Sequence, residues 1–275
     1  MREAPSPALL AEATQALGEL PTPVRIEPSP LTAPYAPDLD AQLQAVWRHR
    51  PAVLTFHFGL PPERVVEQAH RQNIALGVTA TCLRDAQDIA RAGADFVVAQ
   101  GWEAGGHRGS FDPSQPDEEL PVSALVRSLL NCLSIPIVAA GGMMDGRDIA
   151  AVLATGATAA QLGTAFLCCD EAGTPRAHRE ALREGEEETV FTSAFSGLPA
   201  RGMRNTFIAA MADKSMLAFP QQNTLPVALR RWAAASAGDV GYQSVWAGTG
   251  RCKIRSMPAA QLMATIEREL SQAAM

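Results

Sequence analysis

A histidine enclosed by glycines is the residue whose surroundings most clearly suggest chemistry in this sequence. It is His107, in the stretch AQGWEAGGHRG that spans residues 99–109 and directly follows an apolar run. A histidine at the end of a strand can act as a general base near neutral pH, because its ordinary pKa is about 6.5. The flanking Gly105, Gly106 and Gly109 would let the backbone approach a flat ligand closely. A structural histidine is the alternative interpretation.

Other polar residues in or near this stretch have open roles. Glu103 and Arg108 could orient the ring or bind an acidic substrate, and both could equally be solvated loop charges. His57 lies in the apolar run VLTFHFG, where it could line a pocket or be a satisfied core histidine. The remaining histidines are scattered along the chain, at His49, His70 and His178.

Two glycine-containing stretches farther along the chain suggest a phosphate site. They are AAGGMMDGRD (139–148) and AAQLGTAF (159–166), each at the end of an apolar run. Glycines at such a place let backbone N–H groups approach an anion, and the N-terminus of a short helix adds its dipole. The residues that suit this role are Gly141, Gly142, Gly163 and Thr164. The alternative is that these glycines only form tight turns.

Several classes of protein find no support in the sequence. There is no Ser–His–Asp grouping, no GxSxG turn and no cluster with metal-ligand spacing, so neither a hydrolase nor a metalloenzyme is indicated. The five cysteines form no CxxC pair and are expected to be reduced thiols. The formal net charge of −6 comes without any run of Lys or Arg, so we expect neither a nucleic-acid nor a membrane partner. Without a membrane-spanning apolar stretch or a signal pattern, a cytoplasmic protein is expected.

From residue 52 onward, short apolar runs alternate with amphipathic segments, which predicts strands alternating with helices. The predicted strands cover 53–59, 74–79, 95–100, 136–142 and 158–166. The predicted helices between them cover 62–72, 83–93, 122–133 and 145–156. We expect residues 1–175 to form a partial βα barrel with a proline-rich connector at 21–37. Residues 176–275 are then a C-terminal helical segment packed on the barrel as a lid.

Continuous apolar strands separated by single helices indicate a parallel sheet, either open and doubly wound or closed as a (β/α)₈ TIM barrel. Glycines follow the carboxyl ends of successive strands, which favours the barrel; they are Gly59, Gly101, Gly141 and Gly163. An open nucleotide-binding sheet would predict a GxGxxG turn, and the nearest match, GTGRCK at 248–253, lacks the third glycine. Only about five βα units are present, whereas a closed barrel needs eight strands.

Four segments together resemble the FMN-dependent nitronate monooxygenase family. They are AQGWEAGGHRG, VAAGGMMDGRDIAAVLATGATAAQLGTAFL, SAFSGLPARGMRN and YQSVWAGTG, in the family's order and spread over most of the chain. The resemblance implies a TIM barrel with a helical portion and FMN across the carboxyl ends of the strands. It also implies that a nitronate or similar carbon acid is oxidised with O₂ to a carbonyl compound and nitrite, without NAD(P)H.

By position, the resemblance assigns His107 as the catalytic base, which removes the α-proton of a neutral nitroalkane or steadies the anionic nitronate. It implies that Gln100 and Gly105 contact the flavin. The residues that it implies for the phosphate of FMN are Gly142, Gln161, Leu162, Gly163 and Thr164.

Members of the family have about three more strand units upstream of the point at which this chain starts. We therefore expect an N-terminally truncated barrel, from a start site placed too far downstream, a fragment or a shortened paralogue. Two other functions remain open, namely a flavin-dependent enoyl-acyl-carrier-protein reductase that uses NADH and a flavin-free remnant that acts as a binding protein. A phosphosugar-type barrel enzyme gives no reason for the glycines around His107. No pattern in the sequence predicts an oligomeric state.

Overall fold

The computed structural model of the chain describes residues 4–22, 29–35, 37–235 and 240–273, which divide into two compact units. One unit, here called the sheet unit, comprises Asp40–Gly173 and Gly248–Met275. The other, here called the hairpin unit, comprises Met1–Leu39 and Thr174–Ala247. Each unit is therefore assembled from two separate stretches of the chain.

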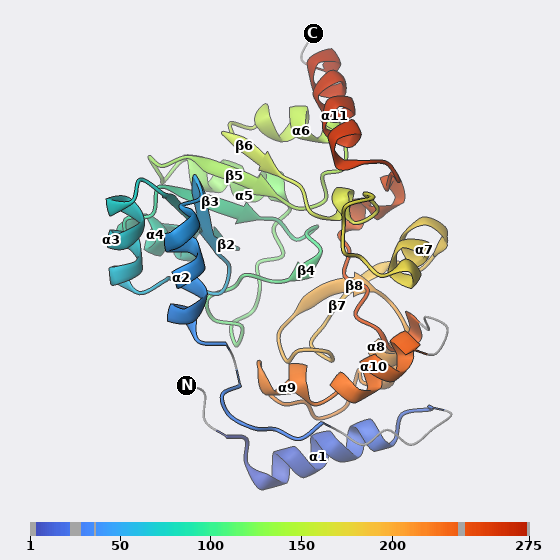
Figure 1. The fold of residues 1–275 in the computed structure, drawn as a ribbon. Helices are drawn as coiled ribbons and strands as arrows, with labels where there is room; N and C mark the ends of the chain where they lie inside the picture. The colour runs from blue at the N-terminus through green and yellow to red at the C-terminus, as the bar shows by residue number, and fades with distance from the viewer. Residues whose placement is uncertain (1–3, 23–28, 36, 236–239, 274–275) are drawn as a thin grey trace. The chain divides into compact units, whose positions relative to one another are not determined.

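The sheet unit is built on a curled parallel sheet of five strands, which Figure 1 shows with its flanking helices. The strands lie in the order β1-β2-β3-β5-β6, and every pairing between them is parallel. Their bounds are β1 (Val53–Phe56), β2 (Ala75–Ala80), β3 (Phe96–Gln100), β5 (Ile137–Ala140) and β6 (Ala159–Gln161). The two-residue strand β4 (Gly106–His107) lies in the loop after β3.

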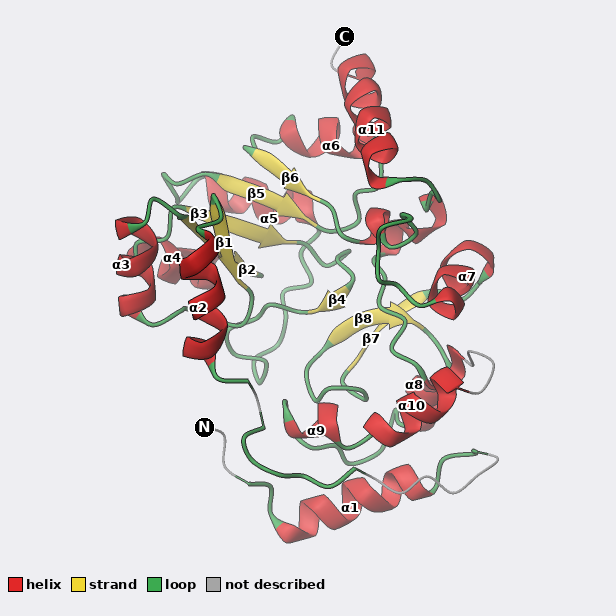
Figure 2. Cartoon of the chain, viewed as in Figure 1, coloured by secondary structure: helices red, strands yellow, loops and turns green. Residues whose placement is uncertain are grey.

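Helices connect consecutive strands of this sheet (Figure 2). They are α3 (Glu63–Arg71), α4 (Leu83–Arg91), α5 (Val122–Leu130) and α6 (Gly146–Leu153), with α2 (Leu39–His49) before β1 and α11 (Ala259–Ala273) at the C-terminal end. In α3 the buried residues Val65, Val66 and Ala69 form an apolar stripe, and α4 and α5 repeat the pattern. Helix α11 packs on α6 and brings the C-terminal stretch onto the sheet unit.

The order of the strands distinguishes between the two parallel architectures that the sequence left open. Strands follow one another across the sheet in sequence order, so there is no point at which the order reverses. A doubly wound sheet requires such a reversal to place helices on both faces. Since parallel crossovers are right-handed, crossovers that all step in one direction place their helices on one face. The sheet unit therefore has the half-barrel form of an α/β protein.

All five predicted strands are confirmed, most of them with shorter bounds. The prediction of a strand up to residue 166 is wrong, because β6 ends at Gln161 and the short 3₁₀ helix η1 (Thr164–Phe166) follows. Gly163 lies between them with φ −118° and ψ −65°, which is not an extended conformation. The apolar residues of this stretch are thus shared between a strand and a helical turn.

The hairpin unit contains the antiparallel strands β7 (Thr189–Thr192) and β8 (Ala200–Met203). Its helices are α1 (Pro7–Gly18), α7 (Arg176–Glu184), α8 (Thr206–Ala210), α9 (Gln221–Thr224), α10 (Val227–Ala235) and η2 (Val240–Tyr242). Helix α1 packs on a core that includes Phe195 and Phe207. The Tyr242 hydroxyl also donates to the carbonyl of Pro21 at 2.7 Å. These contacts explain why the N-terminal helix groups with residues 174–247.

Two expectations about the organisation differ from the structure. The segment 176–275 is not only helical, because β7 and β8 lie in it, and strands of four residues are too short to show an alternating pattern. The unit boundaries also differ, since 4–39 groups with the hairpin unit and 248–273 with the sheet unit. In the connector at 21–37, residues 23–28 and 36 lie outside the described residues, and the others form no helix or strand.

Within the described ranges, none of the helices has both the length and the apolar composition that crossing a membrane requires.

Candidate active site

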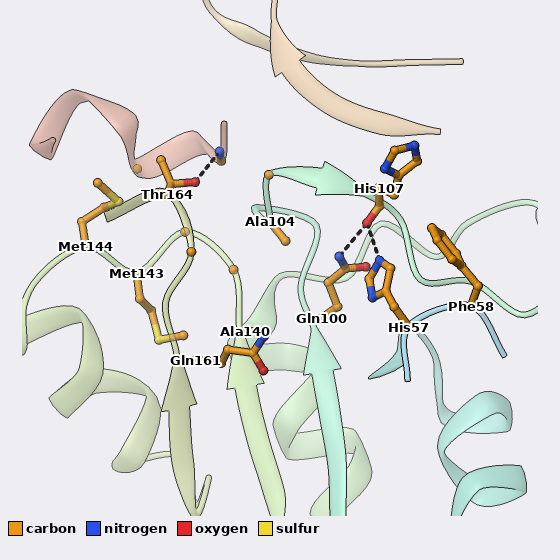
Figure 3. Close-up of a pocket in the computed structure, with 16 residues that line it drawn as sticks. His57, Phe58, Gln100, Ala104, His107, Ala140, Met143, Met144, Gln161 and Thr164 are labelled. Atoms are coloured by element: carbon orange, nitrogen blue, oxygen red, sulfur yellow. Dashed lines mark hydrogen bonds between the residues drawn. The ribbon is translucent and has the colours of Figure 1, made fainter. Parts of the chain in front are cut away.

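A cavity of about 340 Å³ opens at the carboxyl ends of the strands of the sheet unit (Figure 3). It is lined by the loops after β1, β3, β5 and β6 and by residues just after 247, all of which belong to this one unit. Cavities that bind small molecules typically have volumes of about 300–1,000 Å³. The carboxyl ends of the strands are also where barrel proteins place their ligands.

The cavity brings together most of the residues that the sequence assigned to a site. Eight of the nine line it, namely Gln100, Gly105, His107, Gly141, Gly142, Gln161, Gly163 and Thr164. Leu162 does not line it, because its side chain packs against a buried cluster that includes Met144 and Ile149. Neighbouring residues at the end of a strand point to opposite sides, so Gln161 faces the cavity where Leu162 faces the cluster.

The backbone carbonyl of His107 accepts two hydrogen bonds from side chains at the ends of two different strands. Nε2 of Gln100 donates to it at 2.9 Å, and Nε2 of His57 donates at the same distance (Figure 3). Gln100 is the last residue of β3, and His57 directly follows β1. His57 also lines the cavity, so of its two sequence interpretations the pocket residue is confirmed.

The side-chain amide of Gln100 holds the loop of His107 at a second point. Its Oε1 accepts from the backbone N–H of Gly109 at 2.8 Å. Gly109 has no room for a side chain, because a Cβ there would lie 2.7 Å from Cγ2 of Thr79 and 3.0 Å from Cε1 of His57. The close approach of this loop to the sheet therefore requires glycine at position 109.

A buried ion pair supports the same loop. The guanidinium of Arg108 bonds the carboxylate of Asp117 through two contacts of 2.7 and 2.9 Å, and the Arg108 side chain is only 2% exposed. Its Nη1 donates to the carbonyls of Gln100 and Gly101 at 2.6 and 3.1 Å. Arg108 is therefore neither a solvated charge nor a group that faces a substrate. Burial alone would raise the pKa of Asp117, but the bonds from Arg108 hold that pKa below its usual range.

Glu103 has a structural role as well. Its Oε2 accepts from the backbone N–H of Val122 at 2.9 Å, at the first residue of α5. Its backbone carbonyl accepts from the N–H of Thr249 at 3.0 Å. A carboxylate that accepts from the first turn of a helix is stabilised by the helix dipole and satisfies a free donor there. Glu103 thus ties the loop to α5 and to the C-terminal stretch.

The two imidazoles in the cavity are neutral at neutral pH. Burial lowers the pKa of His107, and the nearby His57 lowers it further. Burial also lowers the pKa of His57, with a smaller lowering from the charge of Arg108 and a partial offset from the bond to the His107 carbonyl. A neutral imidazole has a lone pair that can accept a proton, so His107 is in the form that a general base requires.

Glycines form a cradle at the opposite side of the cavity. Gly141 and Gly142 have φ of 124° and 73°, a conformation that other residues rarely adopt. A Cβ at Gly163 would meet no atom within 4 Å, so the space beside it is open. In the part of the chain that the structure describes, the N–H groups of Gly142 and Gly163 have no acceptor. The hydroxyl of Thr164 accepts from the N–H of Gly248 at 3.0 Å and keeps its own proton to donate.

Seven lining residues were not assigned from the sequence: Phe58, Ala104, Ala140, Met143, Met144, Gly248 and Gly250. Some signal existed for Gly248 and Gly250, because they are the glycines of the incomplete motif GTGRCK. The apolar residues carried none, since an apolar side chain at a strand end is equally typical of a core. Over the described residues, no group of three His, Cys, Asp or Glu side chains is placed to hold a metal ion.

A half-barrel with a glycine-lined cavity and a neutral histidine at the carboxyl ends of its strands defines an α/β protein of the barrel class with a small-molecule site. Comparison with known sequences narrows this class to one family. The chain belongs to the nitronate monooxygenase family, whose model matches residues 6–269.

Individual relatives agree with this membership. The nitronate monooxygenase of Paraburkholderia phytofirmans is 45% identical over 238 residues, which cover 84% of this chain and 64% of the relative. That of Pseudomonas aeruginosa is 41% identical over 231 residues, which cover 83% of this chain and 66% of the relative. The chain thus spans somewhat less than two thirds of the length of these relatives.

Solved structures with similar folds include two kinds of protein. The nitroalkane oxidase from Streptomyces ansochromogenes has a TM-score of 0.90 and 38% identity, with all of this chain and 79% of that chain covered. FabK from Thermotoga maritima has a TM-score of 0.68 and 26% identity, with 89% of this chain and 75% of that chain covered.

Substitution of the buried arginine tests whether it holds the loop. Arg108→Lys keeps the charge but cannot bind both oxygens of Asp117 and both carbonyls at once, so we expect a loss of about 1–3 kcal/mol in the free energy of unfolding. Urea denaturation measures it. The matched control is Arg64→Lys, at an exposed pair with Asp40, where we expect a change below about 0.5 kcal/mol. A loss for Arg108→Lys no larger than that of the control would contradict the assignment.

Proposed function

We propose that this chain binds FMN in the cavity of the sheet unit and oxidises alkyl nitronates with O₂ to a carbonyl compound and nitrite. The observation that carries the proposal is that a neutral His107 and a glycine cradle with free N–H groups share one cavity. The printed names of the relatives, nitronate monooxygenase and nitroalkane oxidase, support it. Membership of the family supports a flavin in particular.

The residues present fit a flavin nucleotide. The cradle has open space beside Gly163, where a Cβ would meet nothing, and N–H donors at Gly142 and Gly163 that a phosphate would satisfy. The hydroxyl of Thr164 adds a further donor. Next to the cradle, Gln161 lines the cavity. Leu162 could contact the phosphate only through its backbone, because its side chain packs against the buried cluster of Met144 and Ile149.

The flavin ring would then lie between the cradle and the loop of His107. Gln100 and Gly105 line this part of the cavity, and a Cβ at Gly141 would lie only 3.0 Å from the backbone nitrogen of Ala104. The amide of Gln100 already donates one proton to the His107 carbonyl, which leaves the second N–H of its Nε2 for a ligand. Gly105 places backbone without a side chain against the same space.

A bound FMN would supply the redox chemistry of the reaction, the transfer of electrons from the substrate to O₂. The part of this chain is to prepare the carbon acid for that transfer. His107 takes the α-proton of a neutral nitroalkane onto its imidazole, which turns the substrate into the nitronate. With a nitronate already formed there is no proton to remove, and the N–H of the neutral imidazole steadies the anion by a hydrogen bond. The exposed ring of Phe58, with 51% of its surface accessible, offers an apolar wall beside His107 to the alkyl part of the substrate.

The proposal predicts the colour and the reaction of the protein. Purified protein incubated with FMN and then desalted should be yellow, and in air it should release nitrite from an alkyl nitronate without NADH. The measurements are the visible spectrum and a nitrite assay. Rapid oxidation of NADH that depends on an enoyl thioester would instead support the reductase, and protein that stays colourless after incubation would support a flavin-free binding protein.

A methyl group in the cradle tests the place of the phosphate. In Gly163→Ala the added Cβ would have no protein atom within 4 Å, and position 163 has a negative φ, so we expect the variant to fold normally. The Cβ would occupy the space proposed for the phosphate. Overpacking costs about 1–3 kcal/mol, so we expect the Kd for FMN to rise about 10-fold or more. Flavin fluorescence titration measures it. The control is Gly173→Ala, which also meets no atom and lies outside the cavity; equal Kd values for the two variants would refute the cradle.

Removal of the imidazole tests the role of His107. General bases contribute about 10²- to 10⁴-fold to a rate, so His107→Ala should lower kcat/KM for a neutral nitroalkane by that factor. The loss with a preformed nitronate should be far smaller, because that substrate has already given up its proton. Nitrite release from both forms of one compound measures the difference. Equal losses on both forms, with flavin content unchanged, would show that His107 is not the base.

The pH dependence follows from the lowered pKa of His107. Only the neutral imidazole accepts a proton, so kcat/KM for a neutral nitroalkane should fall as the pH drops through the pKa of this group. Because burial and His57 lower this pKa, the midpoint should lie below about 6.5, and activity should persist at pH 6.5 and above. Initial rates of nitrite release between pH 4.5 and 8 test this expectation, which a midpoint above 6.5 would contradict.

A further inference from the structure

A second histidine, His57, is hydrogen-bonded to the backbone of the candidate base His107 and has no role in the proposed reaction. His57 is half-buried directly after β1, and its ring connects a buried threonine of β2 with the backbone of His107. We propose that His57 is a positioning residue, which Thr79 holds through a hydrogen bond to Nδ1 and which fixes His107 by donating from Nε2 to its carbonyl. The link to catalysis rests on the proposed function; the hydrogen-bond arrangement does not.

The two bonds of His57 determine its tautomer. Nε2 lies 2.9 Å from the carbonyl oxygen of His107, and a carbonyl can only accept, so Nε2 carries the proton. In the neutral ring Nδ1 then has a lone pair, which accepts from the hydroxyl of Thr79 at 3.1 Å. Thr79 is only 5% exposed, so its hydroxyl is shielded from solvent. A chain of donors therefore runs from Thr79 through His57 to the loop.

The loop of His107 needs an external support of this kind. Gly105 and Gly106 precede the histidine and Gly109 follows it, so the backbone on both sides has little conformational preference of its own. Side chains at the ends of two strands of the five-stranded sheet, His57 and Gln100, both bind the carbonyl of His107. Loss of one donor would let the imidazole shift, and a displacement of about 1 Å at a reacting group can cost about 10²-fold in rate.

The surroundings of His57 favour the arrangement with a neutral ring. Burial of the ring, and to a smaller extent the charge of Arg108, disfavour a second proton on His57 and lower its pKa. The ring of Phe58 lies edge-on to His57 and to His107, with ring centroids 4.8 and 5.7 Å apart. A backbone glycine at 109 lies directly against its Cε1.

Paired substitutions separate the donated bond from mere space filling. His57→Gln places an amide N–H near the position of Nε2 and should keep the bond to the carbonyl, whereas His57→Asn is too short to reach it. Thr79→Val keeps the shape of the side chain but removes the hydroxyl, and Thr79→Ser restores it. His57→Asn should lose the hydrogen bond to the His107 carbonyl, and Thr79→Val should lose the hydrogen bond to Nδ1 of His57. His57→Gln and Thr79→Ser should each keep the corresponding bond.

Nuclear magnetic resonance tests the geometry without substrate or flavin turnover. In the wild-type protein, ¹⁵N shifts should show His57 protonated on Nε2 and not on Nδ1. In Thr79→Val the proton should stay on Nε2, because the His107 carbonyl still requires it, while the ¹⁵N shift of Nδ1 should change because Nδ1 no longer accepts a hydrogen bond. In His57→Asn the ¹³C resonance of the His107 carbonyl should move upfield because one hydrogen bond is lost, and in His57→Gln it should stay near the wild-type position. A proton on Nδ1 of His57 in the wild type would overturn the proposal.

Kinetics on the flavin-loaded protein test the consequence. For a neutral nitroalkane we expect kcat to fall about 10- to 100-fold in His57→Asn and less in Thr79→Val, with KM and flavin content little changed. His57→Gln and Thr79→Ser should stay within about threefold of wild type. Equal losses in the glutamine and asparagine variants would overturn the positioning role. If the wild type itself releases no nitrite, the proposed function fails, while the tautomer and carbonyl measurements still confirm or refute the support of His107.

Discussion

The candidate site depends on one buried guanidinium. Arg108 neutralises Asp117 and at the same time binds two carbonyls at the end of β3, so a charge that would be costly to bury alone becomes the anchor of the loop. Three further side chains also fix the position of this loop. Glu103, Gln100 and His57 each bind a different point of it and connect it to a helix or a strand. These contacts fix one conformation of a glycine-rich backbone that has little conformational preference of its own.

The parallel sheet decides where that loop and the glycine cradle meet. Because the strands follow in sequence order, consecutive βα loops emerge side by side at one edge. The loops after β3, β5 and β6 therefore line one cavity although they are separated by up to about 60 residues in the chain. The hydroxyl of Thr164 and the carbonyl of Glu103 then bind the stretch that begins at Gly248, which adds a further wall.

The sequence predicted the sheet and most of the cavity because both leave strong patterns. Buried parallel strands read as apolar runs, and glycines at their ends mark a ligand face. This pattern indicated His107 and the glycine stretches, and the family resemblance added Gln100, Gly105 and Gln161; all of them line the cavity. Short elements were missed, since β7 and β8 have four residues each. The role of Arg108 was also not predictable, because its partner Asp117 is nine residues away in a segment without periodicity. Likewise, nothing in the run VLTFHFG indicates which atoms His57 would bind.

The sheet unit is discontinuous in the chain, and this has a consequence for synthesis. Its main part, 40–173, is synthesised before the 74 residues of the hairpin unit at 174–247, and the closing stretch from Gly248 follows them. Glu103 and Thr164 cannot meet their partners Thr249 and Gly248 until then. During translation the half-formed cavity therefore exists with its wall absent and its apolar lining open to solvent. During this interval the exposed apolar surface can aggregate or bind chaperones.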